Sequence, residues 1–151
     1  MKFNLPFPKA AIVPVLFLLS ISAYSASKVV ISRTGRRYAD SGAKSLYAKD
    51  YQTAITQLRT AIRLKPDYWP PQYDLGVALY NVGSTQEAID ELRKALRMNS
   101  YDVPSHFYLG KALAKQHKTE EARNEFNIAI SHDNDSEWTH NARKEIEKFK
   151  W

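Results

Sequence analysis

The chain has 151 residues, of which 44% are hydrophobic and 25% are charged, a composition typical of a globular protein and not of a disordered one. It contains no cysteine, which excludes disulfide bonds, cysteine-based zinc sites, thiol catalysis and lipid attachment through a cysteine. The formal net charge is +6, but charges of both signs alternate along the expected helices and form no basic stripe, so we do not expect nucleic-acid binding.

Residues 1–25 differ from the rest of the chain and predict a targeting segment. Lys2 and Lys9 are its only charged residues, and an apolar run extends from Ala10 to Ile21. This run is shorter than the roughly 20 residues of a typical membrane span and contains Pro14. The segment is therefore predicted to act in targeting and not to belong to the fold.

Two interpretations of this segment stay open. Small residues at Ala23 and Ser25 favour a signal peptide cleaved between Ser25 and Ala26, with the remaining chain exported to the periplasm or secreted. Alternatively, the uncharged stretch between Lys9 and Lys28 is long enough for a tilted single-pass anchor, and the basic residues after it oppose export. In that case the protein associates with a membrane through residues 1–25.

Residues 26–36 are predicted to form a basic linker. The stretch from Ala26 to Arg37 contains four basic residues and no acid. It is interpreted either as a solvated tether or, if the anchor is retained, as a contact with anionic lipid head groups.

A pattern of 34 residues repeats three times between residues 37 and 135. The copies are about 37–68, 69–102 and 103–135, and the second is the clearest. Two positions are alanine in every copy, and one is a large apolar residue: Ala54, Ala88 and Ala122; Ala61, Ala95 and Ala129; Leu58, Leu92 and Phe126. A fixed period of this length is typical of stacked helix pairs, and about three copies are needed for a stable stack.

The first copy departs from the pattern. A strict 34-residue register places Ser41 and Ser45 where the second copy has leucines, which would bury two hydroxyl groups. A shift of one residue instead gives a continuous apolar stripe of Ala39, Gly42, Ala43 and Leu46. We therefore expect a one-residue deletion in the first turn, with Asp50 as the N-cap of the helix that follows.

Residues 136–151 do not form another pair. The stretch from Ser136 to about Phe149 is predicted to be one amphipathic helix with Trp138, Ala142, Ile146 and Phe149 on one face. Such a helix would cover the apolar end of the stack. The final residue, Trp151, is a further candidate for docking on a partner.

Small residues stand where the two helices of a copy should cross, at Gly76 with Ala88 and at Gly110 with Ala122. Leucines lie on either side of them, as in Leu75, Leu79 and Leu92 of the second copy. This arrangement resembles the tetratricopeptide repeat. The resemblance implies an all-α fold, a right-handed superhelical solenoid of antiparallel helix pairs.

No residues form a pattern that predicts catalysis or cofactor binding. The four histidines share no helical face and no zinc-ligand motif, and the Asp133, Asp135 and Glu137 alternation lacks the glycine and the glutamate of a calcium loop. A phosphate-binding glycine loop is also absent. We therefore expect no enzymatic activity, no cofactor and no metal.

In the resembled family, the first helix of each pair lines the concave face, which implies that a protein or peptide binds there. The candidate binding residues on these helices are Tyr47, Tyr73, Asp74, Val77, Tyr80, Phe107, Tyr108 and Lys111. Tyr47 and Tyr80 are expected to be equivalent once the shorter turn is allowed for. Tyrosine suits recognition because its ring is large and rigid, although the same rings also suit packing between repeats.

One known type of binding site is not expected. Family members that hold the C-terminal carboxylate of heat-shock chaperones present lysine, asparagine and arginine from three repeats. The corresponding positions here hold Ala39 or Asp40, Ala43 or Lys44, Asp74, Pro104 and Tyr108. The sequence thus predicts a module that binds an extended or helical segment with apolar anchors. The alternative is a membrane-anchored accessory or assembly subunit of a larger complex.

Overall fold

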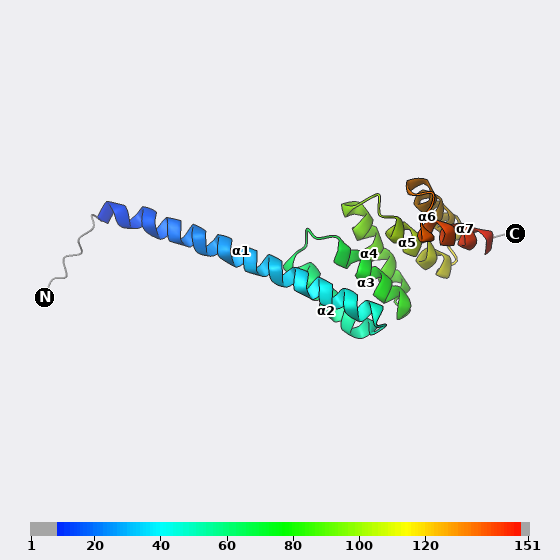
Figure 1. The fold of residues 1–151 in the computed structure, drawn as a ribbon, viewed down its shortest axis with the longest axis horizontal. Helices are drawn as coiled ribbons and strands as arrows, with labels where there is room; N and C mark the ends of the chain where they lie inside the picture. Colours follow the sequence, from blue (N-terminus) through cyan, green and yellow to red (C-terminus); the bar gives the residue numbers. More distant parts are fainter. Residues whose placement is uncertain (1–8, 149–151) are drawn as a thin grey trace.

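The computed structural model describes the backbone of residues 9–148 and the side chains of residues 24–148. Within these residues the chain is helical throughout, with no strand. The helices are α1 (Lys9–Tyr47), α2 (Tyr51–Leu64), α3 (Pro70–Asn81), α4 (Thr85–Met98), α5 (Val103–Lys115), α6 (Thr119–His132) and α7 (Glu137–Lys148). Consecutive helices pack as antiparallel pairs into one elongated stack, from which α1 projects (Figure 1).

Residues 26–36, the expected basic linker, are helical. The expected linker is part of α1, which continues without interruption into the first repeat. The stretch has no proline, and Gly35 lies so close to α2 that an added Cβ would be 3.0 Å from the Cβ of Lys65. The end of α2 therefore supports α1 up to this point, while the earlier residues project into solvent (Figure 1).

The register of the repeats is constant, and the expected deletion in the first turn is wrong. The first helices end at Tyr47, Asn81 and Lys115, and the second helices begin at Tyr51, Thr85 and Thr119, each 34 residues apart. The middle residue of each turn has a positive φ: 62° at Lys49, 87° at Gly83 and 61° at His117. Lys49 thus adopts the left-handed conformation that glycine adopts in the second copy, and no residue is missing.

The serines that suggested the deletion are accommodated because, in the described residues, no helix pair lies before α1. Ser41 and Ser45 are partly exposed, and the Ser45 hydroxyl donates a hydrogen bond to Gln57 Oε1 at 3.2 Å. Leu75 and Leu79, at the equivalent positions of the second copy, are buried against α2 of the copy before. Position in the stack, and not a shifted register, explains the difference in polarity.

Each helix pair crosses at a glycine. A Cβ added to Gly42, Gly76 or Gly110 would lie 2.6 Å from a side-chain carbon of Leu58, Leu92 or Phe126, respectively. These three partners are fully buried, so they have little freedom to move aside. The crossing contact therefore repeats with the same 34-residue period as the turns.

The helix α7 covers the end of the stack, as expected. It begins one period after α5, and its Ala142 is fully buried in the cluster that contains Phe107 and Phe126. Arg143 and Lys144 are exposed at the positions where α5 has the buried Leu109 and Gly110. The helix thus takes the position of the first helix of a fourth copy, and the face on which α5 packs against its second helix is charged in α7. Phe149 and Trp151 lie outside the described residues.

No helix in the described part of the chain is both long enough and apolar enough to span a membrane. The apolar run from Ala10 to Ile21, which carries both targeting interpretations, lies outside the residues whose side chains are described. The signal peptide and the anchor both stay predictions.

Candidate protein-binding groove

The first helices of the pairs lie on the inner side of the stack. The helix α3 contacts both α1 and α5, and α5 contacts α7, whereas the backbones of α2, α4 and α6 do not meet one another in the described residues. Long side chains connect the second helices instead, in two ion pairs one period apart, Arg59 with Glu87 at 2.8 Å and Arg93 with Glu121 at 3.2 Å. A stack in which only the first helices touch must curve toward them, so they line the concave face.

An aromatic cluster connects three first helices on this face. Tyr108 of α5 is at its centre, with ring centroids 6.1 Å from Tyr73 and from Tyr80 of α3 and 5.8 Å from Trp138 of α7. All four rings are partly buried. Edge-to-face contacts of this kind hold the rings rigidly while leaving part of each one exposed.

A lysine lies among these rings. The Nζ of Lys111 is 5.1 Å from the ring centroid of Tyr80, and 5.5 Å from those of Phe107 and Tyr108. Within the described residues it forms no ion pair. The aromatic faces stabilise the ammonium group without neutralising it. Its charge thus remains available to an acidic group of a partner.

A cavity of about 500 Å³ opens beside this lysine, between α5 and α7. Phe107, Tyr108 and Lys111 of α5 line one side of it, and Trp138 and Asn141 of α7 line the other, together with the charged residues Glu137, Lys144, Glu145 and Lys148. Glu145 pairs with Lys148 at 2.7 Å, and in the described residues neither glutamate forms an ion pair with Lys111. Sequence reasoning placed Trp138 only on the buried face of the terminal helix. The 34-residue period could have placed it in the groove, because α7 begins one period after α5 and so takes the position of a first helix.

The structure brings together only some of the eight candidate residues. Tyr73, Tyr80, Tyr108 and Lys111 lie together on the face of the first helices, joined by ring contacts and by the lysine beside the Tyr80 ring. Val77 and Phe107 are each only 5% exposed, so their side chains belong mainly to the core. Phe107 contributes a ring to the wall of the cavity, but Val77 contributes no exposed surface of note.

Tyr47 does not match its expected role. It is 88% exposed at the end of α1 and is equivalent to Asn81, not to Tyr80, in the constant register. Leu46 is the residue that stands at the position of Tyr80, and it is partly buried against the core. The expected equivalence of Tyr47 and Tyr80 depended on the one-residue deletion. Because there is no deletion, this equivalence is also wrong.

Asp74 lies in an unusual electrostatic environment. Burial, and to a lesser degree the carboxylate of Asp102, raises the pKa of Asp74 to about 6. Burial, with Tyr108 and Asp74 as neighbours, raises the pKa of Tyr73 well above its ordinary range, so its hydroxyl stays neutral. An anionic group of a partner would be repelled at this end of the groove.

His106 has a structural partner outside the groove. Its Nδ1 lies 2.7 Å from Glu125 Oε2 and its Nε2 lies 3.1 Å from the carbonyl oxygen of Ser100. Burial alone would lower the pKa of His106, but these two hydrogen bonds raise it above its usual value. The imidazole thus connects α5 to α6 and to the loop before α5, and no grouping of His, Asp and Glu in the described residues could hold a metal ion.

Two family models match the chain. The model described as TPR repeat matches residues 46–83, and the one described as Tetratricopeptide repeat matches residues 73–137. The chain is a tetratricopeptide repeat protein. Together the matches span more than half of its length and include the first turn, the second and third copies and the start of α7. No curated protein has a sequence that matches it.

Solved structures with the same fold are numerous. The TPR domain of OM64 from Arabidopsis has a TM-score of 0.74 at 18% identity, with 80% of this tetratricopeptide repeat chain and 99% of that chain covered. The first TPR of Spaghetti (RPAP3), bound to the HSP90 peptide SRMEEVD, has a TM-score of 0.72 at 16% identity, covering 78% and 93%. The type III secretion translocator chaperone SycD from Yersinia enterocolitica has a TM-score of 0.68 at 13% identity, covering 77% and 88%.

Proposed function

We propose that this protein is a non-catalytic interaction module that binds a peptide or protein segment in its concave groove. The observation that carries the proposal is the cluster of partly buried rings of Tyr73, Tyr80, Tyr108 and Trp138, with the ammonium group of Lys111 beside Tyr80 and Tyr108. That ammonium group forms no ion pair in the described residues. Rigid rings beside a cavity offer apolar anchoring sites at low entropic cost. The likeness to a TPR domain bound to a peptide supports the same reading, because that protein uses this fold for recognition.

The partner is expected to differ from a peptide held by its terminal carboxylate. Asp74 stands where the carboxylate-binding members of the family have an asparagine, and its own charge is already unfavourable at neutral pH. The aromatic rings and Lys111 fit instead a segment with apolar or aromatic side chains and one acidic group close to them. The acidic group would pair with Lys111, and the apolar groups would enter the cavity beside Trp138.

Site-specific photo-crosslinking tests the groove directly. A photoreactive phenylalanine analogue placed at Tyr80 should capture the partner in the native cell. The same analogue at Asn127, an exposed position on α6 outside the groove, serves as the matched control. Capture of the same species with equal yield from both positions would contradict the assignment of the groove.

A second candidate function is a membrane-anchored accessory subunit of a larger complex. The continuity of α1 from Lys9 to Tyr47 favours this function. If the N-terminal end of this helix were anchored, the helix would hold the repeats at a fixed distance from the membrane. The alternative location is the periplasm or the exterior after cleavage between Ser25 and Ala26. The mass of the natively expressed protein decides between them: a chain that begins at Ala26 supports export, and an intact Met1 in the membrane fraction supports the anchor.

A further inference from the structure

The net charge of this protein lies entirely at its N-terminal end. The first acidic residue of the sequence is Asp40, and six of the 22 lysines and arginines precede it. The chain from Asp40 onward therefore holds 16 basic and 16 acidic residues and is formally neutral, so the whole net charge of +6 belongs to residues 1–39. The charges of the chain from Asp40 onward thus balance without these six cations.

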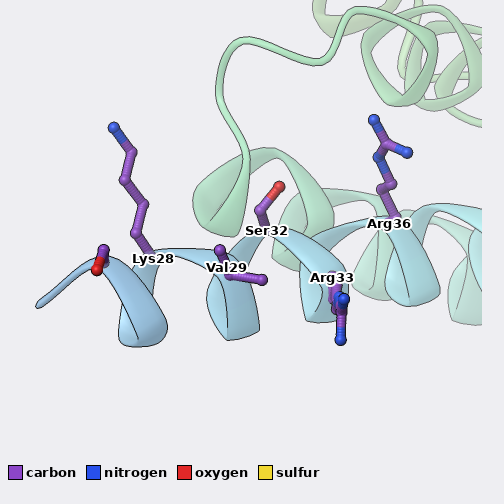
Figure 2. A pocket seen from close by; sticks show the side chains of 6 residues that line it. Lys28, Val29, Ser32, Arg33 and Arg36 are labelled. Atoms are coloured by element: carbon purple, nitrogen blue, oxygen red, sulfur yellow. The ribbon is translucent and has the colours of Figure 1, made fainter. Parts of the chain in front are cut away.

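The structure shows where four of these charges lie. Lys28, Arg33 and Arg36 line a shallow hollow along α1, together with the half-exposed side chain of Val29. Lys28 and Arg36 extend to the same side of the helix, and Arg33 extends to the opposite side (Figure 2). Ser32 lies between Lys28 and Arg36 and presents its hydroxyl on the same side as these two residues (Figure 2). Arg37, the fourth cation, is exposed next to Arg36.

Little in the neighbouring elements neutralises these cations. Arg36 lies over the ring of Tyr68, 5.8 Å from its centroid, and forms no ion pair in the described residues. The loop after α2 contributes one acid, Asp67, beside a second hollow that Lys28 also lines, and Lys65 lines the same hollow and offsets its charge. The local field on this part of α1 therefore stays positive.

Apolar side chains are exposed on the same segment. Tyr24 is 72% exposed, Val30 is 61% exposed and Ile31 is 48% exposed. Tyr24 and Ile31 line the second hollow beside Leu64 and Pro66, but both keep about half or more of their surface exposed. Exposed aliphatic and aromatic groups among cations are typical of a surface that enters the boundary between lipid head groups and acyl chains.

We propose that residues 24–37 of α1 form a docking surface for a membrane that contains anionic lipids. The cations would pair with lipid phosphates and carboxylates, and the apolar side chains would leave water for the interface. A nucleic acid would satisfy the cations but would offer nothing to Val30 and Ile31. The segment is about 20 Å long, so it can reach the interface while the groove stays free in solution.

The docking surface does not depend on how the N-terminus is processed. A chain cleaved before Ala26 keeps all four cations and loses only Tyr24 from the apolar set. A chain that keeps residues 1–25 also keeps the four cations, and the apolar run from Ala10 to Ile21 then precedes them. The proposal is also independent of the groove, because none of its residues lies there.

Flotation of the full native protein with lipid vesicles tests the proposal. Vesicles of phosphatidylcholine alone are compared with vesicles that also contain phosphatidylserine. The readout is the difference in binding between the two kinds of vesicle. Insertion of the apolar run from Ala10 to Ile21 would increase binding to both kinds equally, so it does not change this difference. We expect at least about tenfold tighter binding to the anionic vesicles, lost at high salt.

Two charge-matched variants make this test specific. Replacing Lys28, Arg33, Arg36 and Arg37 by glutamine should abolish the preference for anionic vesicles. Replacing four exposed cations of the repeats, Arg63, Arg97, Lys118 and Arg143, by glutamine gives the same net charge and should preserve it. Circular dichroism confirms that both variants are folded.

Three outcomes would overturn the proposal. The first is equal binding of the native protein to both vesicle types. The second is an equal loss in the two variants, which would reduce the effect to net charge. The third is binding of a short DNA duplex through the α1 cations without any preference for anionic vesicles, which would assign the surface to nucleic acid instead.

Discussion

The ring of Tyr108 packs edge to face against the ring of Tyr80, with centroids 6.1 Å apart and an interplanar angle of 71°. This contact joins the first helices of the second and third repeats across the concave face. Both rings pack against the core cluster and are only partly buried, so part of each ring stays exposed. The two rings thus contribute both to folding and to the surface offered to a partner.

Removing rings from this region should separate core positions from groove positions. Phe107→Ala should lower the free energy of unfolding by about 3–5 kcal/mol, because the side chain is only 5% exposed. Tyr80→Ala should cost less, and Tyr47→Ala should change stability by less than about 0.5 kcal/mol, because that side chain is 88% exposed. Urea unfolding of the three variants measures this order, and a Tyr47 variant as unstable as the Phe107 variant would refute it.

The glycine at each helix crossing should not tolerate even a methyl group. Gly76→Ala places a Cβ 2.6 Å from the Cγ of the fully buried Leu92 and should cost about 1–3 kcal/mol. Gly42→Ala, at the equivalent position against Leu58, should behave alike. Thermal unfolding of both variants checks the prediction. Unchanged melting temperatures would show that the helices are farther apart than the structure places them.

The turns within the repeats offer a gain in stability. Lys49 and His117 have positive φ values of 62° and 61°, which cost energy in residues with a Cβ. Lys49→Gly and His117→Gly should each raise the free energy of unfolding, by up to about 1 kcal/mol after the added entropy of the unfolded chain is counted. The matched control is Gly83→Lys in the second repeat, where φ is 87°, and it should destabilise the protein. Urea unfolding measures all three changes. Destabilisation by Lys49→Gly or His117→Gly, or stabilisation by Gly83→Lys, would contradict the shared turn geometry.

The carboxyl group of Asp74 should make stability depend on pH. Its pKa is about 6 in the folded protein against an ordinary value of 3.8, so between these pH values the folded state keeps a proton that the unfolded state releases. The free energy of unfolding should therefore fall as pH rises through this window, and the full loss should be present above pH 6.

Asp74→Asn provides the test of that dependence. It should raise the free energy of unfolding at pH 7, by on the order of 1–3 kcal/mol, and leave it nearly unchanged at pH 4. Urea unfolding at the two pH values gives both numbers. A variant that is destabilised at pH 7 would show that the charged carboxylate has a favourable partner instead.

The 34-residue period was sufficient to predict the helix pairs, the crossing glycines Gly76 and Gly110 and the terminal helix, because each of these repeats with the packing that produces it. The third crossing glycine, Gly42, was not predicted, because the expected deletion displaced the first copy by one residue. Polarity alone was misleading in the first repeat. Ser41 and Ser45 looked incompatible with a strict register only because the absence of a helix pair before α1 in the described residues was not considered. Lys49 was not recognised as the residue with positive φ, since lysine rarely adopts it.

The groove was predicted less completely than the fold. Val77 is buried because α3 contacts four other helices, α1, α2, α4 and α5. The exposed face of α3 is therefore narrower than the spacing of residues along a helix indicates. Trp138 was missed as a groove residue because the last helix was considered only as a cover for the core. The continuity of α1 was also missed, since a basic stretch without acids is typical of a tether as well as of an exposed helix.

The most direct test of the central claim is the affinity of the partner captured from position 80, measured by titration calorimetry against three forms of the full protein. The native protein is compared with the Lys111→Ala variant and with the Tyr101→Ala variant, whose side chain is 75% exposed outside the groove. We predict at least about tenfold weaker binding for the Lys111 variant and native affinity for the Tyr101 variant. Native affinity for both variants, or an equal loss in both, would show that the partner does not bind in the groove.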